Sequence, residues 1–217
     1  MTTLTDVARG AELDLFCAID RSAHVSERFQ VLLLGSTRMT KRYAIAAALF
    51  SICLEHRESV LLLVRKGART SAMALGRPTL EAYVTGLWVH RLATEAELSS
   101  FMGGRSPASY ERMSQRLRKV HEFGELFETL RAHYATLSDY THGYSRQVSR
   151  WIGPEGIGPR HADGEIVSLL RFVDAIGILA CIAQEKLADR PVEELSLLLG
   201  SVLYGTPILE GPDQATE

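Results

Sequence analysis

The sequence has few of the features that mark secreted, metal-binding or membrane-spanning proteins. Its three cysteines, Cys17, Cys53 and Cys181, lie far apart within apolar stretches, so no close pair is available to begin a zinc site or a redox motif. No apolar run approaches the roughly 20 residues that a membrane-spanning helix needs. The first ten residues lack the basic start and long apolar stretch of a secretory signal. The sequence therefore predicts a cytoplasmic protein with reduced core thiols and no contact with a membrane.

An excess of charge of one sign is also missing, since the formal net charge is −2 at pH 7. A chain so close to neutrality has no bulk attraction for nucleic acid or anionic lipid, so either partner would need a local basic patch. Lysine is scarce, and the 24 basic residues include only Lys41, Lys66, Lys119 and Lys186. The arginines that make up the remainder suit forked contacts with phosphate, but they serve ordinary surface ion pairs equally well.

Strand signals are nearly absent, because no sustained alternation of apolar and polar residues occurs. Apolar residues, 46% of the chain, instead recur every three or four positions, as on the buried side of a helix. The pattern predicts one all-α domain over residues 1–217, built as a bundle of about five to seven helices. A long glycine-rich loop is predicted near 143–164, and a disordered tail over 200–217.

Local signals place several helix ends. Thr40 is predicted to cap a helix that stops near Gly67. Pro78 lies inside the helical pattern of residues 70–93, where it should kink the helix or divide it into two. Asp163 is predicted to cap a long apolar helix that follows the glycine-rich loop.

The block Ser-Ala-Met-Ala-Leu-Gly-Arg-Pro-Thr-Leu-Glu-Ala-Tyr at 71–83 contains the first candidate site. It places Arg77 and Glu81 four positions apart in an otherwise apolar helix, so the two side chains can meet on one face. One interpretation is an internal ion pair that shapes the bundle. The other is that Glu81 orients Arg77 so that its guanidinium points at an anion such as a phosphate.

A second block, Ser-Asp-Tyr-Thr-His-Gly at 138–143, lies between a predicted helix and the glycine-rich loop. A histidine in such a place suits proton transfer, because its ordinary pKa is near neutrality and a substrate can reach it. The alternative is that the polar residues cap the helix end while His142 binds a carbonyl.

These two blocks resemble a group of bacterial domains of unknown function that are related to the HEPN superfamily, over roughly residues 40–187. HEPN domains are helical bundles that commonly dimerise, and many active members cleave RNA without a metal through an Arg-x(4–6)-His motif from each protomer. The resemblance implies a homodimer that acts on RNA as a metal-independent endoribonuclease, without a cofactor. It also implies a toxin-type effector of bacterial defence that meets a cognate protein partner.

The family motif can be placed on this chain in two ways. Arg116 and His121 have the literal Arg-x4-His spacing, but Leu117 replaces the polar residue that usually follows the arginine. The favoured placement uses His142, and Leu137 then stands where the arginine is expected. The resemblance in that case implies His142 for proton transfer, with Arg77 offsetting phosphate charge from another helix and Glu81 orienting it.

Other basic and aromatic residues are candidates for binding the RNA strand. The resemblance and the charge pattern imply backbone contacts from Arg146 and Arg150, and stacking on unpaired bases by three aromatic residues, Tyr140, Tyr144 and Trp151. A basic track is predicted from Arg112, Arg116, Arg118 and Lys119, although charge runs are usually solvated helix faces.

Two further expectations concern what the site does not contain and what the chain does if it is no enzyme. A di-metal bundle would need repeated Glu-x-x-His pairs, and the single Asp139-x-x-His142 does not supply them, so no metal is expected. The alternative function is a non-catalytic helical interaction or regulatory module. It is motivated by the incomplete Arg/His motif and the near-neutral net charge.

Overall fold

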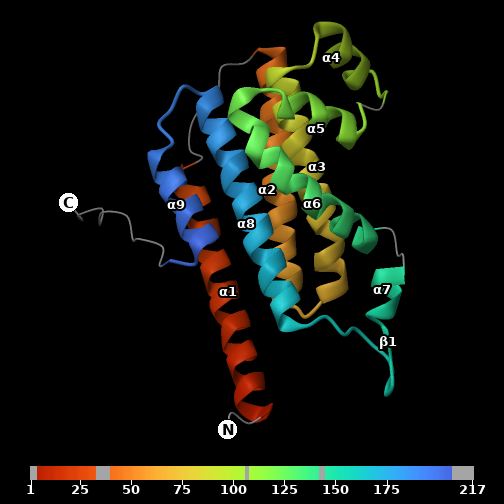
Figure 1. Cartoon of the computed structure of the whole chain (residues 1–217). Helices are drawn as coiled ribbons and strands as arrows, with labels where there is room; N and C mark the ends of the chain where they lie inside the picture. The colour runs from red at the N-terminus through yellow and green to blue at the C-terminus, as the bar shows by residue number, and fades with distance from the viewer. Residues whose placement is uncertain (1–3, 33–39, 106–107, 142–144, 207–217) are drawn as a thin grey trace, which may run out of the picture.

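The computed structural model describes residues 4–32, 40–105, 108–141 and 145–206, and these residues are almost wholly helical. The all-α prediction is confirmed (Figure 1). Nine α-helices lie within the described ranges, more than the five to seven predicted. In chain order the elements are α1 (Leu4–Leu32), α2 (Lys41–Arg65), α3 (Arg69–Arg91), α4 (Glu95–Met102), α5 (Tyr110–Arg118), the short 3₁₀ helix η1 (His121–Phe123), α6 (Gly124–Thr141), α7 (Ser145–Ser149), β1 (Ile152–Gly153), β2 (Gly156–Ile157), α8 (Asp163–Leu187) and α9 (Glu193–Tyr204).

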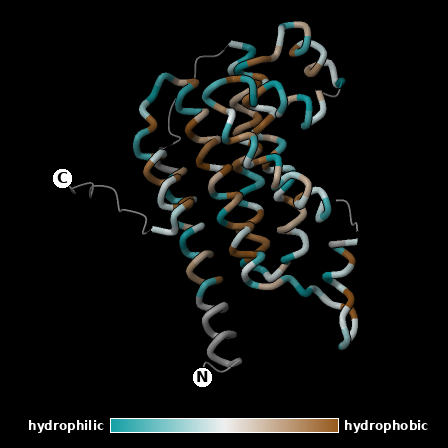
Figure 2. Tube along the Cα trace, in the orientation of Figure 1, coloured by the Kyte–Doolittle hydropathy of each residue, from teal (hydrophilic) through white to brown (hydrophobic). Residues whose placement is uncertain are grey.

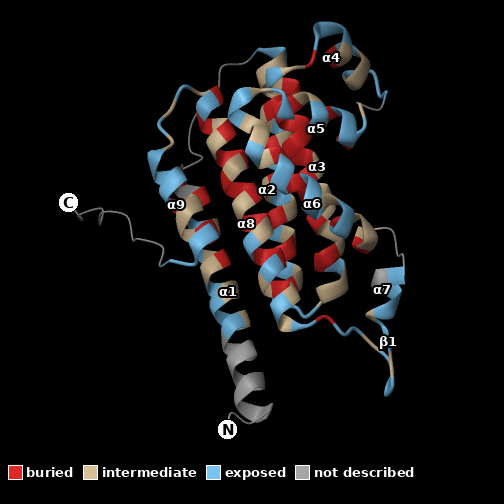
Figure 3. Ribbon diagram, viewed as in Figure 1, coloured by how far each residue is buried: buried red, intermediate tan, exposed pale blue. Residues whose placement is uncertain are grey.

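The long helices α1, α2, α3 and α8 form the body of the bundle (Figure 1). Helix α8 contacts all three of the others, and α9 packs on its outer side. Helix α6 lies across α3 and carries α5 against it. The short helix α7 and the strand pair project from the body at the end of α6 (Figure 1). Buried residues gather where α2, α3 and α8 face one another (Figure 3).

Helix α8 is the apolar centre of the bundle, as its sequence pattern predicts. Its inward face is buried along its whole length, from Ile166 and Leu170 to Ile176 and Ala180. Within the described residues α8 is also the one helix long and apolar enough to cross a membrane, judged by length and composition. However, 67% of its apolar window is buried inside the bundle. Burial in the core therefore accounts for the hydrophobicity of α8. Figure 2 shows apolar residues along α8 and along the long helices beside it.

A buried polar network joins three helices within this core. Arg57 of α2 is completely buried and donates to Asp174 Oδ1 of α8 from Nε over 2.8 Å and from Nη2 over 2.6 Å. Ser22 of α1 donates to the same oxygen over 2.8 Å. Isolated buried charges are costly, so each of these groups requires the others. Arg57 lies on the apolar stripe of α2, four positions after Cys53 and three before Val60, so the helical spacing agrees with its inward position but does not identify its partners.

The segment predicted as a long loop over 143–164 contains regular structure. It holds α7 and a two-stranded antiparallel pair, in which Ile152 is opposite Ile157 and Gly153 is opposite Gly156. Gly156 has a φ of +121°, a conformation that glycine adopts without strain. Pro154 and Glu155 form the tight turn, and Gly156 begins the second strand directly after it. The sequence does not predict this strand pair.

Three predicted helix features have different outcomes. Thr40 caps α2, because its side-chain oxygen accepts a hydrogen bond from the Tyr43 backbone N–H over 3.3 Å. Of the two outcomes predicted for Pro78, a kink or a division, the division is wrong, since α3 runs without a break from Arg69 to Arg91. Ala162 occupies the N-cap position of α8, and Asp163 is the first residue of that helix rather than its cap.

The predicted tail over 200–217 begins later than expected. Helix α9 continues to Tyr204 because Val202 packs into the core with 1% of its surface exposed. It ends at Gly205, whose φ of 69° is the left-handed conformation that commonly terminates a helix. Residues 207–217 lie outside the described residues.

Candidate functional site

Arg77 and Glu81 meet on one face of α3, as their spacing predicts. Arg77 Nε donates to Glu81 Oε1 over 2.8 Å, and the Tyr134 hydroxyl of α6 donates to the same oxygen over 2.9 Å. The Arg77 guanidinium also lies over the Tyr134 ring, 5.0 Å from its centroid. The side chains of Arg77 and Glu81 are 20% and 36% exposed. The three groups therefore form an ordered network at the edge of the α3–α6 interface, within reach of solvent.

The protonation of this network is fixed near neutral pH. Burial raises the pKa of Tyr134 to about 12, and the Glu81 carboxylate adds to the rise. Burial acts to lower the pKa of Arg77, but the hydrogen bond and charge of Glu81 outweigh it, so the net shift is upward. Arg77 is therefore a permanent cation, and Tyr134 remains a hydrogen-bond donor.

Pro78 determines how α6 docks onto this part of α3. In a regular helix the N–H of residue 78 would donate to the carbonyl of Ala74, but proline has no N–H. The hydroxyl of Thr141, the last residue of α6, lies 3.2 Å from the Ala74 carbonyl and 3.1 Å from the Leu137 carbonyl of its own helix. Its single proton is shared between these two acceptors, so another helix replaces the missing helical hydrogen bond in part. This contact brings the end of α6 to α3 within one helical turn of Arg77.

The proposed proton-transfer residue follows directly on this contact in the sequence. His142 lies outside the described residues, as does Tyr144, so the pairing of His142 with Arg77 stays a prediction. The side chain of Arg146 is likewise outside the part of the chain that the structure describes. The described residues of this region are Arg77 with its network partners Glu81 and Tyr134, and Thr141 at the end of α6.

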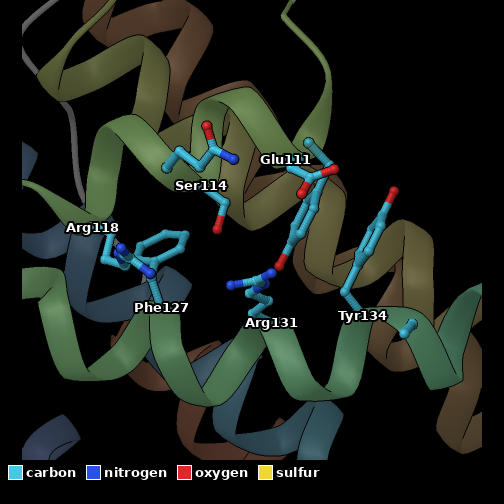
Figure 4. A pocket seen from close by; sticks show the side chains of 9 residues that line it. Glu111, Ser114, Arg118, Phe127, Arg131 and Tyr134 are labelled. Atoms are coloured by element: carbon cyan, nitrogen blue, oxygen red, sulfur yellow. The ribbon is translucent and has the colours of Figure 1, made fainter.

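A hollow of about 240 Å³ opens between α5 and α6, next to the Arg77 network. Figure 4 shows Arg131 reaching from α6 into the hollow, with Phe127 and Arg118 at one end and Tyr134 at the other. We refer to this hollow as the α5–α6 pocket. Its lining residues are Tyr110, Glu111, Ser114, Gln115, Arg118, Phe127, Arg131, Tyr134 and Ala135.

Tyr110 connects the pocket to the Arg77 network. Its ring stacks on that of Tyr134, with centroids 3.6 Å apart and planes 3° from parallel. Tyr110 is 8% exposed, and its buried hydroxyl makes no hydrogen bond that meets ordinary geometric limits within the described residues. Burial raises the pKa of Tyr110, although the nearby Ser114 hydroxyl acts in the opposite direction. The pocket therefore contains a neutral hydroxyl without a well-formed partner.

A second polar cluster ties the segment after α6 to the body of the bundle. Trp151 Nε1 donates to the Thr70 hydroxyl over 3.0 Å, and that hydroxyl lies 3.3 Å from Nε2 of the buried His161. Arg150 forms an ion pair with Glu165 at the start of α8. Burial lowers the pKa of His161, so its ring is neutral near pH 7. The cluster therefore anchors Arg150 and Trp151 rather than leaving them unattached.

The residues predicted to bind RNA do not form one continuous surface. Tyr140 is 3% exposed and packs among core residues of α3 and α8, so its ring is not available for stacking and that prediction is wrong. Arg112, Arg118 and Lys119 are exposed at α5, whereas Arg150 and Trp151 lie beyond the other end of α6. The 18 residues of α6 correspond to a length of about 27 Å. The predicted RNA-binding residues therefore form two separate groups.

The alternative Arg/His placement is not supported by contacts. Arg116 pairs with Glu97 over 2.7 Å and donates to the Leu92 carbonyl over 2.9 Å, which fastens α5 to the preceding helices. His121 is exposed on η1. Among the described residues, no hydrogen bond or ion pair joins Arg116 to His121. Arg116 therefore acts as a structural anchor.

Four polar residues of these clusters are not among the site residues that the sequence predicts, namely Tyr110, Arg131, Tyr134 and His161. One signal was present, since Phe127, Arg131 and Tyr134 follow the i, i+4, i+7 spacing of one helix face. The partner helix α5, which makes this face into a pocket, could not be identified from the spacing.

In the described part of the chain, no three His, Cys, Asp or Glu side chains are grouped so that they could hold a metal ion.

Comparison with known proteins gives a family but no activity. No curated protein and no solved structure matches the chain significantly. A family model described as a family of unknown function (DUF6988) matches residues 50–196, a range that includes Arg77, the α5–α6 pocket and Thr141. The chain therefore belongs to this family of unknown function.

Proposed function

We propose that the protein acts on RNA as a metal-independent endoribonuclease, with Arg77 at the phosphate and His142 as the proton-transfer group. The observation that carries the proposal is the bond from Thr141 to the Ala74 carbonyl. It brings Thr141, the last residue of α6, against α3 one helical turn from Arg77, and His142 is the next residue in the sequence. The homodimer, the cytoplasmic location, a cognate protein partner and a toxin-type role in bacterial defence belong to the same proposal.

The proposed chemistry needs a base, an acid and a fixed positive charge. His142 removes the proton of a ribose 2′-hydroxyl, whose oxygen forms a bond to the adjacent phosphorus while the bond from phosphorus to the 5′-oxygen breaks. A second histidine, from a partner copy, gives a proton to the leaving oxygen. Arg77 offsets the negative charge that develops on the phosphate oxygens.

The network around Arg77 supports this role because it limits the motion of the guanidinium. Glu81 binds Nε, and the Tyr134 ring supports the planar group from below. A guanidinium held in one orientation loses less conformational freedom when it binds a phosphate than one on a flexible surface. Glu81 in this proposal is a positioning residue.

Cleavage of labelled single-stranded RNA in the presence of EDTA tests the proposal, with His142→Ala and Arg77→Gln compared with the wild type. We expect each variant to lower the rate by about 100-fold or more, the size of typical acid–base and charge-stabilisation effects. Arg91→Gln is the matched control, because Arg91 lies on the same helix, pairs with Glu122 and covers the Phe123 ring at 5.8 Å.

The outcomes separate the parts of the proposal. Equal cleavage by the wild type and His142→Ala removes His142 from the mechanism. Loss of activity in Arg91→Gln as large as that in Arg77→Gln assigns Arg77 a general structural role. Absence of EDTA-resistant cleavage across RNAs of varied sequence overturns the enzymatic proposal and favours the second candidate.

The second candidate is a non-catalytic interaction module, and exposed apolar residues favour it. Val148, Trp151, Ile152 and Ile157 lie within ten residues of one another and are 49%, 38%, 64% and 85% exposed. Clusters of exposed apolar side chains commonly mark contacts with other proteins. Under this candidate, the double variant Ile152→Ser, Ile157→Ser weakens association with a partner protein and leaves the thermal midpoint of the folded protein unchanged.

A further inference from the structure

We propose that the α5–α6 pocket binds an unpaired guanine base, and that it sets which nucleotide of the RNA lies next to Arg77. The identity of the polymer as RNA rests on the proposed function, whereas the preference for guanine rests on the pocket itself. The size of the pocket, the chemistry of its lining and its connection to the Arg77 network each support this inference.

The pocket has the size of a ring system rather than of a larger ligand. Its volume of about 240 Å³ is below the roughly 300–1,000 Å³ that is typical of pockets for drug-sized molecules. Phe127, which is 1% exposed, and the edge of Tyr134 give the pocket an aromatic border on α6, and α5 supplies polar side chains opposite. A flat ligand with polar edges fits this combination, and unstacked bases in RNA are bound by aromatic contact together with hydrogen bonds to their edges.

Arg131 provides the donors for one edge of the base. It reaches into the pocket from α6 (Figure 4). Arg118, the other cation of the lining, pairs with Glu128 over 2.5 Å, whereas no ion pair to Arg131 occurs within the described ranges. Guanine presents two adjacent acceptors, O6 and N7, and a bidentate arginine contact with them is the commonest specific contact to a base. Adenine has a donor in place of O6 and does not match the arginine fork.

Glu111 provides the matching acceptor for the other edge. It lines the same pocket from α5 and is exposed, so its carboxylate can accept the N1–H and N2–H donors of guanine. Cytosine also combines acceptors with a donor, but it offers a carboxylate one donor group instead of two. The pair of Arg131 and Glu111 therefore favours guanine over the other three bases.

The hydroxyl of Tyr110 is the independent sign that the pocket is built to receive a polar ligand. Tyr110 is more than nine-tenths buried, lines the pocket and lacks a well-formed hydrogen bond. Buried polar groups in proteins are nearly always hydrogen-bonded, so such a group points to a missing partner. The hydroxyl has almost no accessible surface, so an acceptor on the base would supply that partner once the Tyr110 side chain shifts toward the pocket.

The pocket and the Arg77 network share one side chain, which links base binding to the proposed chemistry. Tyr134 lines the pocket, donates to Glu81 and lies beneath the Arg77 guanidinium. Tyr110 stacks on the Tyr134 ring and Arg77 lies over it, so a base in the pocket would meet the edge of the ring that carries Arg77. Binding of the base in this position would orient the phosphate for reaction.

Titration of the full chain with GMP, AMP, CMP, UMP and ribose 5-phosphate, followed by calorimetry and protein NMR, tests the inference. We expect GMP to bind at least about 10-fold more tightly than the others, and Arg131→Gln to weaken GMP binding by about 5- to 150-fold, the range of one bidentate base contact. Glu111→Gln should reduce the preference for GMP. Tyr110→Phe should weaken GMP binding without lowering the thermal midpoint, because it removes only the hydroxyl.

The control is Arg65→Gln, an exposed arginine on α2 outside the pocket, which should leave GMP binding unchanged. Equal binding of all four nucleotides, binding that ribose 5-phosphate matches, or no binding of GMP by the wild type at millimolar concentrations would overturn the inference. GMP preference without RNA cleavage retains the pocket and rejects the proposed enzyme. Cleavage with no preference for guanosine at the cut site does the reverse.

Discussion

Asp174→Ala should be one of the most destabilising substitutions in the described part of the chain. Asp174 Oδ1 accepts three hydrogen bonds, one from Ser22 and two from Arg57. Arg57 has no exposed surface and Asp174 is 2% exposed, so removal of the carboxylate leaves the cation inside the core with the half-exposed Glu58 as its remaining ion-pair partner. Breaking a buried ion pair in this way costs about 3–5 kcal/mol.

The expected loss converts into a large change in the thermal midpoint. For a domain of this size each kcal/mol corresponds to about 2–4 °C, so Asp174→Ala should lower the midpoint by about 6–20 °C. Urea unfolding followed by circular dichroism gives the free energy directly. The matched control is Glu128→Ala, which breaks the Arg118–Glu128 pair, whose side chains are 49% and 58% exposed. Its cost should stay below about 1 kcal/mol.

A double variant tests the reasoning behind the magnitude. Arg57→Met combined with Asp174→Ala removes both charges, so no uncompensated cation remains, and much of the stability lost in the single variant should return. If Asp174→Ala is no worse than Glu128→Ala, the carboxylate does not neutralise Arg57. If the double variant is as unstable as the single one, lost packing rather than the buried charge accounts for the effect.

Two further predictions concern close packing and pH. Gly86→Ala should cost about 1–3 kcal/mol by urea unfolding, because an added Cβ would lie 2.6 Å from a Phe50 ring carbon. Gly200→Ala in α9 is the control and should be neutral or stabilising, because an added Cβ there has nothing within 4 Å. Equal effects of the two substitutions would contradict the tight α2–α3 contact. Burial lowers the pKa of His161 below its ordinary value of 6.5, so the unfolded chain binds a proton at higher pH than the folded chain does. The contribution of His161 to stability is therefore present above about pH 6.5 and is lost as the pH falls. His161→Gln should reduce this pH dependence of the urea midpoint, and an unchanged slope would assign it to other groups such as His90, whose pKa burial also lowers.

The helical architecture could be predicted because the apolar spacing of the long helices is local information. The inward face of α8 and the cap at Thr40 both follow from residues within a few positions of each other. The polar network of the core could not be predicted in this way, since Arg57 and Asp174 are 117 positions apart. The strand pair was missed because its two strands are two residues each, too short to show an alternating pattern.

The candidate site divides along the same line. The spacing of Arg77 and Glu81 predicts their ion pair, because side chains four positions apart meet on a helix. Their third partner, Tyr134, is 53 positions from Glu81 and belongs to another helix. Tyr140 was predicted to stack on RNA bases, but its packing among core residues of α3 and α8 buries it. Which face of a helix is covered depends on the tertiary arrangement.

The gap in the hydrogen bonding of α3 has a dynamic consequence. Each turn of a helix normally resists local opening because consecutive amide bonds break together. At Pro78 that continuity is interrupted, and the Ala74 carbonyl is held by Thr141 instead. Detachment of the end of α6 would therefore let the first half of α3 open separately, with faster amide exchange there than in the second half. A molecule that pulls α6 away would at the same moment loosen the backbone that carries Arg77. Detachment of α6 and disordering of the Arg77 network would therefore be a single event.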